Sequence, residues 1–249
     1  ETNVDLSWLA VVAAVADRQD QNEGRSLGSL NKSIVEEAEN AGFLNVSKDL
    51  IFYGRSTKPI HKAIASSSTP FIQGITGNED VALKALKTSG LKLQDENRWR
   101  TISELTDEEK KRVMEAIIPY LTNSPKPGET VEDLIGSIYT LTKEDEYSYL
   151  RDSREFATLL NACGRMRASG IGVSICMGDR SGGLNDGEKI LMEYRKSLGK
   201  YIRSTVGVEG VSIEKEKLHV IVGDEIIDEY MIGSFTSILG SMPNFKGKH

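Results

Sequence analysis

An aspartate stands at the point where the most apolar segment of the sequence ends. Asp17 directly follows the run LSWLAVVAAVA (Leu6 to Ala16) and opens the polar string DRQDQNEG. A carboxylate at the end of a buried element is costly unless a capping amide, a cation or a metal ion compensates its charge. A turn or a helix cap is the commoner role of such a residue. Asp20, three residues on, could share a site with Asp17 or lie in solvent.

Arginines gather in the string SYLRDSREFATLLNACGRMR, around an apolar helical face. On a helix, Arg151 and Arg154 would be neighbours, and Arg165 follows Arg154 by eleven residues, close to three turns, on the same face. A row of guanidinium groups at this spacing could contact phosphates through bidentate hydrogen bonds. A solvated helix on which the arginines pair with Asp152 and Glu155 explains the same pattern, so both interpretations stay open.

A glycine-rich turn, GDRSGG, covers Gly178 to Gly183 between an apolar segment and a helical one. Backbone amides at such a turn can bind a phosphate group. The string matches neither the phosphate-loop nor the dinucleotide-binding fingerprint, and an ordinary connection explains it equally well.

The histidines and cysteines show no catalytic or metal-binding pattern. His61, His219 and His249 have no ligand spacing to one another or to a cysteine, and no Ser-His-Asp or zinc signature is visible. Cys163 and Cys176 lie in apolar segments, which favours buried reduced thiols over a disulfide or a ligand pair. Reduced thiols indicate a reducing compartment.

The composition is that of an ordinary globular protein. The 249 residues are 39% hydrophobic and 27% charged, with a formal net charge of -6, enough for one large domain or two smaller ones. This charge argues against a generally basic nucleic-acid coat but permits a local basic groove. The apolar run at the start is well short of the roughly 20 residues needed to span a bilayer, and it lacks a signal-peptide pattern. We therefore expect a cytoplasmic protein.

Helices and strands alternate along the chain. Leu6 to Ala16 is rich in Ala, Leu and Val, so a helix and a buried strand are both possible, and we favour a helix. Further helices are predicted over Ser29 to Ala41, Glu79 to Ser89, Thr106 to Leu121, Ser153 to Met166, Asp186 to Ile202 and Tyr230 to Leu239. Strands are predicted over Gly136 to Leu141, Ile171 to Met177, Val208 to Ile213 and Lys217 to Val222. The intervening stretch 49–77 is rich in loop-forming residues. This alternation predicts an α/β fold.

Cap residues support several of these helices. Gly42 suits the position after the second helix, and Asn78 the N-cap of the third. Thr106 and Glu109 have the spacing of a capping box, as do Asn185 and Glu188. The string TNSPKPGET after Leu121 is typical of a linker and marks the expected domain boundary.

Five strings of the sequence resemble a known family. They are AVVAAVADRQD, LGSLNKSIVEEAENAG, DLIFYGRSTKPI, REFATLLNACGRM and GVSICMGDR. They are similar to archaeal RecJ-type proteins of the DHH phosphoesterase superfamily, in particular the GINS-associated nuclease branch. The similarity covers roughly residues 6 to 245, and FATLLNACGR and CMGDR are its more specific parts.

The resemblance implies a two-domain α/β clamp. In this family a DHH domain holds two divalent metals, usually Mn²⁺ or Mg²⁺, and a DHHA1 domain after a linking helix grips single-stranded DNA or RNA. On this chain, residues 1–104 would be the C-terminal part of the DHH domain, 105–121 the linking helix and 129–249 an incomplete DHHA1-like domain. The implied reaction is phosphodiester hydrolysis by a single-strand-specific exonuclease, linked to DNA replication or repair.

The resemblance also gives roles to single residues. Asp17 matches the late acidic metal ligand of the DHH domain, where a metal would compensate its charge. Arg154, Asn161 and Arg165 fall in the segment that enters the DHHA1 domain, so we expect them to contact nucleic acid. No catalytic residue is assigned within this chain.

Two family motifs are absent from the sequence. The early Asp-rich motif with the DHH triplet and the GGGH-like DHHA1 motif do not occur. Because Glu1 stands in place of an initiator methionine, we expect an internal fragment of a longer enzyme rather than a degenerate homologue. One carboxylate cannot hold two metals, so this chain alone should not be a competent nuclease. The alternatives are a non-catalytic replisome scaffold that binds GINS, and a DHH phosphoesterase acting on short oligonucleotides or small phosphate esters.

Overall fold

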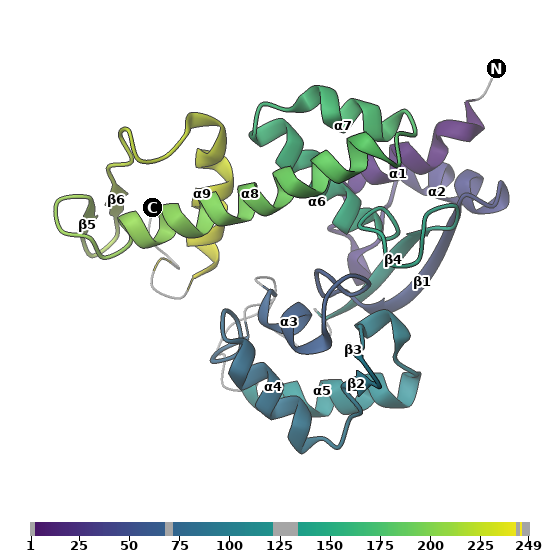
Figure 1. Cartoon of the computed structure of the whole chain (residues 1–249), viewed down its shortest axis with the longest axis horizontal. Coiled ribbons are helices and arrows are strands. Elements are labelled where there is room, and N and C mark those ends of the chain that lie inside the picture. Colours follow the sequence, from purple (N-terminus) through teal and green to yellow (C-terminus); the bar gives the residue numbers. More distant parts are fainter. Residues whose placement is uncertain (1–2, 68–71, 122–133, 243–244, 246–249) are drawn as a thin grey trace. The chain divides into compact units, whose positions relative to one another are not determined.

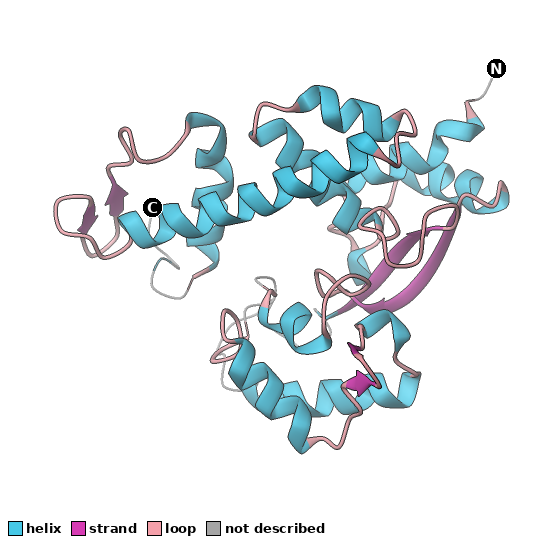
Figure 2. Ribbon diagram, viewed as in Figure 1, coloured by secondary structure: helices cyan, strands magenta, loops and turns pink. Residues whose placement is uncertain are grey.

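A computed structural model describes residues 3–67, 72–121, 134–242 and 245. The chain divides into two compact units, Glu1–Ala157 and Thr158–His249, with the division inside a helix. Figure 2 shows that helices dominate both units. In the described part of the chain, none of the helices combines the length and the apolar character needed to cross a membrane.

The first unit combines helices with two antiparallel strand pairs. Its elements are η1 Val4–Leu6, α1 Ser7–Ala16, η2 Glu23–Arg25, α2 Leu30–Asn40, β1 Leu44–Leu50, α3 Ile60–Ala65, α4 Glu79–Thr88, β2 Gln94–Asp95, β3 Arg98–Trp99, η3 Ile102–Glu104, α5 Asp107–Leu121, β4 Ile135–Leu141 and the start of α6 Ser153–Arg165. Strand β1 pairs with β4, and β2 pairs with β3.

The second unit is built around one long helix. Its elements after α6 are α7 Ser169–Cys176, α8 Gly182–Thr205, β5 Ser212–Glu214, β6 His219–Ile221, η5 Glu229–Met231 and α9 Ile232–Ser241. Strands β5 and β6 form an antiparallel pair. The mixture of helices and strands confirms the α/β class, and every strand pair among the described residues is antiparallel.

The strand pair β1–β4 encloses an inserted module (Figure 1). The register runs from Leu44 opposite Leu141 to Leu50 opposite Ile135. One step further, the Ile51 amide donates to the Leu134 carbonyl at 2.9 Å. Residues 52–133 therefore leave and re-enter the fold at the same place. The described part of this module has its own apolar core, formed largely by α3, α4 and α5: Phe52, Ile60, Ile64, Ile72, Ile75, Leu86, Ile102, Val113, Ile117 and Leu121.

Several predicted helix ends are confirmed. The Asn78 side chain accepts from the Val81 amide at 3.1 Å, and Gly42 adopts a φ of 73° after α2. At α5, the Thr106 amide donates to Glu109, and the Glu109 amide donates to the Thr106 hydroxyl. A bidentate contact from Arg100 reinforces this capping box, and it lowers the pKa of Glu109 to about 2.

Several parts of the structure differ from the prediction. Residues 44–50 form β1, which the sequence pattern did not predict because its polar residues obscure the alternation. The stretch 49–77, predicted as loop, includes helix α3 and therefore His61. Helix α8 begins at Gly182, before the predicted Asn185 cap. The predicted linker 122–130 lies within 122–133, outside the described residues, so the division into 1–104, 105–121 and 129–249 stays a prediction.

The predicted strand over Ile171 to Met177 is a helix, α7. A short apolar run does not distinguish a strand from a packed helix. Here Gly172 and Ile175 are buried while Val173 and Met177 are exposed, a helical rather than an alternating pattern. Helix α7 packs closely on α8, since a methyl group added at Gly187 would lie 2.7 Å from Ile175 Cδ1.

This close approach predicts opposite effects for two helical glycines. Gly187→Ala should lower the free energy of unfolding by roughly 1–2 kcal/mol, because the fully buried Ile175 must move. Gly164→Ala, in α6, meets no atom within 4 Å and should be neutral or stabilising by up to about 1 kcal/mol. Chemical denaturation of both variants measures the difference, and equal effects would contradict the tight α7–α8 packing.

Candidate functional site

Asp17 lies at the C-terminal end of α1 with its side chain exposed. Its amide donates to the Ala13 carbonyl at 3.0 Å, and its Oδ2 atom accepts from Gln19 Nε2 at 2.8 Å. These contacts are those of a local helix cap, one of the two roles that the sequence left open. The metal-ligand role stays a prediction.

Asp20, by contrast, is buried and paired with a cation. Arg154 Nη2 contacts Asp20 Oδ2 at 2.6 Å, across 134 residues of sequence. The same guanidinium donates to the carbonyls of Ser137 at 2.7 Å and Arg25 at 3.3 Å. The Tyr139 hydroxyl accepts from the Leu27 amide at 2.7 Å. Arg154 and Tyr139 thus hold the segment that follows Asp17 against β4.

The other predicted contact residues lie elsewhere on α6 or before it. Asn161 is exposed. Arg165 is exposed and donates to the Tyr230 carbonyl at 3.0 Å. Arg151 precedes α6 and donates to the carbonyls of Leu141, Thr142 and Glu144, so it is no helical neighbour of Arg154. A nucleic-acid contact by Arg154, Asn161 and Arg165 remains a prediction.

Sequence reasoning missed a buried carboxyl group in the next position of α6. Glu155 is 1% exposed. Its Oε1 accepts from the Ser56 amide at 3.3 Å and its Oε2 from the Thr57 hydroxyl at 2.5 Å. Burial, and then the neighbouring charge of Asp152, raise the pKa of Glu155 to about 7. Ser56 and Thr57 lie in the string YGRSTKP, 99 and 98 residues before Glu155. No sequence pattern links two segments so far apart.

The turn around Ser56 is itself tightly held. Arg55 Nη2 contacts Asp49 Oδ2 at 2.5 Å, and Lys110 Nζ contacts the same oxygen at 2.8 Å. Lys58 Nζ donates to Ser66 Oγ at 2.8 Å, and burial lowers the Lys58 pKa. Perturbed groups of this kind mark functional candidates. Here both Glu155 oxygens are engaged by the turn, so the arrangement serves to fix α6 to the start of the inserted module.

The backbone amides of the turn GDRSGG bind the side chain of an aspartate in the same turn. The Asp179 carboxylate accepts from the Ser181 amide at 3.0 Å and the Gly183 amide at 2.9 Å. The hydrogen bonds from these two amides lower the pKa of Asp179, and the bond from Ser181 has the largest effect. The turn follows a helix instead of a strand, and its amides are used as a helix cap. A phosphate would have to displace Asp179.

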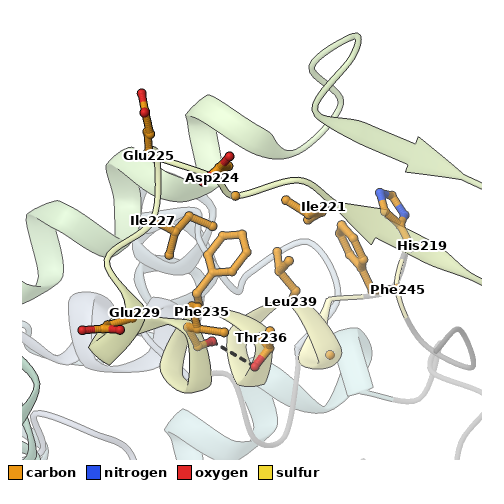
Figure 3. A pocket seen from close by; sticks show the side chains of 13 residues that line it. His219, Ile221, Asp224, Glu225, Ile227, Glu229, Phe235, Thr236, Leu239 and Phe245 are labelled. Carbon is orange, nitrogen blue, oxygen red and sulfur yellow. Dashed lines mark hydrogen bonds between the residues drawn. The ribbon is translucent and has the colours of Figure 1, made fainter.

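A large cavity in the second unit is mostly apolar, although His219, Asp224 and Thr236 also line it. It has a volume of about 590 Å³, and Ile221, Ile227, Phe235, Leu239 and Phe245 contribute to its lining. Figure 3 shows Glu225 and Glu229 pointing away from these side chains. A catalytic pocket needs polar groups that converge on its interior, so this cavity does not define a reaction.

The cysteines are free, as the sequence predicted. Cys163 is buried, Cys176 is only partly so, and burial raises the pKa of both thiols.

The described residues do not fit a two-metal centre. Within them, no group of three or more His, Cys, Asp or Glu side chains lies close enough to hold a metal ion. No step of a reaction is therefore assigned to a metal here.

Comparison with known proteins identifies the inserted module. Residues 52–135 match the family described as "DHH-CID domain", and this range coincides with the segment enclosed by β1 and β4. The chain is also similar to the uncharacterized protein MJ0831 of Methanocaldococcus jannaschii, with 32% identity over 200 residues. These residues are 80% of this chain and 40% of that protein, so the chain spans about two fifths of its relative. This likeness of residues 52–135 supports the resemblance to the DHH family at the level of that domain.

The Glu155 contact predicts a specific dependence of stability on pH. A folded pKa of about 7, above the usual 4.5, means that the folded state keeps a proton which the unfolded state has lost. Stability should therefore fall as pH rises from about 4.5 to 7, by on the order of 2–3 kcal/mol. Glu155→Gln should remove this slope, whereas the exposed Glu146→Gln should keep it. Denaturation at several pH values tests this, and an unchanged slope in Glu155→Gln would contradict it.

The Arg154–Asp20 pair predicts coupling between two distant positions. Arg154→Gln leaves a largely buried carboxylate without its cation and should destabilise the protein more than Arg154→Gln combined with Asp20→Asn. We expect a coupling energy of about 1–3 kcal/mol from a double-mutant cycle. Additive effects would show that the pair does not hold the segment after Asp17.

Proposed function

We propose that this chain is part of a DHH-family phosphoesterase that hydrolyses the phosphodiester bonds of single-stranded nucleic acid, in DNA replication or repair. The DHH-CID match over residues 52–135 carries the proposal. It supports a phosphoesterase or nuclease-like protein, and the resemblance to RecJ-type exonucleases supplies the narrower substrate.

The proposal gives this chain a binding and positioning role. Asp17 would supply one carboxylate to a site for Mn²⁺ or Mg²⁺ whose remaining ligands lie outside the described residues. Arg154 supports this role indirectly, because its bonds to Asp20 and the Arg25 carbonyl fix the segment after Asp17. Arg154 is thus a positioning residue for the carboxylate in addition to its expected nucleic-acid contact.

The experiment compares two exposed aspartates in the full-length protein. Asp17→Asn should lower the Mn²⁺- or Mg²⁺-dependent shortening of a labelled single-stranded oligonucleotide by on the order of 10²-fold or more. Asp5 is also exposed and lies just before α1, and Asp5→Asn should leave the rate unchanged. Because neither carboxylate is buried, both variants should fold like the wild type.

The outcomes separate the alternatives. Equal activity of the two variants would refute the metal-ligand role of Asp17. If the wild type shortens only very short oligonucleotides or small phosphate esters, the protein is a phosphoesterase of that narrower kind. No hydrolysis at all by the wild type, together with binding of GINS, would refute the proposal in favour of a non-catalytic scaffold.

A further inference from the structure

The C-terminal half of helix α8 carries exposed cations and no carboxylate. From Tyr194 to Thr205 the helix contains no acidic residue. Lys196, Lys200 and Arg203 are exposed within this stretch. Their spacings of four and three residues place them on one side of the helix. The buried Leu191 and Leu198 lie on the other side.

These three cations, here called the α8 ridge, have no ion-pair partner among the described residues. No described carboxylate lies within 4.0 Å of them. Earlier on the same side, Lys189 contacts Asp186 at 2.8 Å, whereas the exposed Glu193, three residues before Lys196, forms no ion pair with it. Like charges at these spacings repel one another. The helix dipole favours a cation only in the last turn, where Arg203 alone lies.

The geometry of the ridge fits a single row of phosphates. Successive cations are four and three residues apart, ~6 and ~4.5 Å along the helix axis, so their long side chains can reach neighbouring phosphates of an extended strand. A membrane-binding helix would need a free apolar face beside its cations, whereas the apolar face of α8 is buried. A single row of three cations can follow one chain of phosphates, which is what the single-stranded substrate of the proposed function presents.

We propose that Lys196, Lys200 and Arg203 bind the phosphate backbone of single-stranded nucleic acid. This inference rests on the proposed function and adds a surface that the sequence did not single out. The lysines act as point charges, and Arg203 can hold two oxygens of one phosphate. Contacts to the backbone alone carry no base preference.

The test measures binding without hydrolysis. A labelled single-stranded oligonucleotide is titrated with the protein in EDTA at several salt concentrations, and fluorescence anisotropy gives the affinity. The triple variant Lys196→Gln, Lys200→Gln, Arg203→Gln should bind more weakly. The slope of log affinity against log salt concentration should be smaller in magnitude by about 2, since each of the three phosphate contacts on a single strand contributes ~0.7.

A matched control removes three other exposed cations. Lys84 and Lys87 lie three residues apart on α4, and Lys143 lies in the loop after β4. Changing these three to Gln alters the net charge equally and should leave the salt slope as in the wild type. If the triple ridge variant fails to fold, the single variants serve instead, each with a slope lower by about 0.7.

Several results would overturn the inference: no binding by the wild type, an unchanged slope in the ridge variants, or an equal loss in the control. Duplex DNA, anionic vesicles or an acidic peptide that binds the ridge as tightly as the oligonucleotide would also refute the single-strand assignment. The results that would refute the proposed function differ from those that would refute this inference. Ridge-dependent binding without metal-dependent hydrolysis leaves this inference standing, and hydrolysis with ridge-independent binding refutes this inference alone.

Discussion

The pairing of β1 with β4 is the constraint on which the first unit depends. The two strands are separated by more than eighty residues, yet their register is continuous up to the contact between Ile51 and Leu134. This ladder brings the two ends of the inserted module together, and Leu50 and Leu134 at its end join the apolar core of the module. It also positions the start of α6, since the Leu141 amide donates to the Arg151 carbonyl and Thr140 bridges to Asp152.

The start of α6 then uses adjacent residues to hold two distant segments. Arg154 binds the segment after α1, and Glu155 binds the turn that opens the inserted module. The two contacts differ in kind. Arg154 and Asp20 compensate each other's charge, whereas Glu155 receives neutral donors and retains a proton near pH 7. A buried ion pair gives a specific geometry, and an uncompensated carboxyl group makes the stability of the second contact depend on pH.

The sequence predicted the local features of the fold better than the long-range ones. Helices with clear periodicity and caps, such as α4 and α5, follow from neighbouring residues alone. Strand β1 was missed because its pattern, LNVSKDL, has meaning only opposite β4. Helix α7 was mistaken for a strand because a seven-residue apolar run has no visible period. Strings of residues carry the resemblance to the DHH family, and the match of residues 52–135 to the DHH-CID domain supports it. The partners of Arg154 and Glu155, by contrast, lie about a hundred or more residues away, and only folding brings them together.

The distribution of charge bears on how an acidic chain could bind a polyanion, as we propose. With a net charge of -6, the protein as a whole repels a nucleic acid strand at long range. Several surface lysines contact a carboxylate, as on α2, α5 and the first turns of α8. Salt screens the general repulsion beyond about 10 Å, so a local group of cations can attract an anion that the total charge repels. On our proposal, the absence of acidic residues from the last turns of α8 therefore matters more for binding than the total charge does.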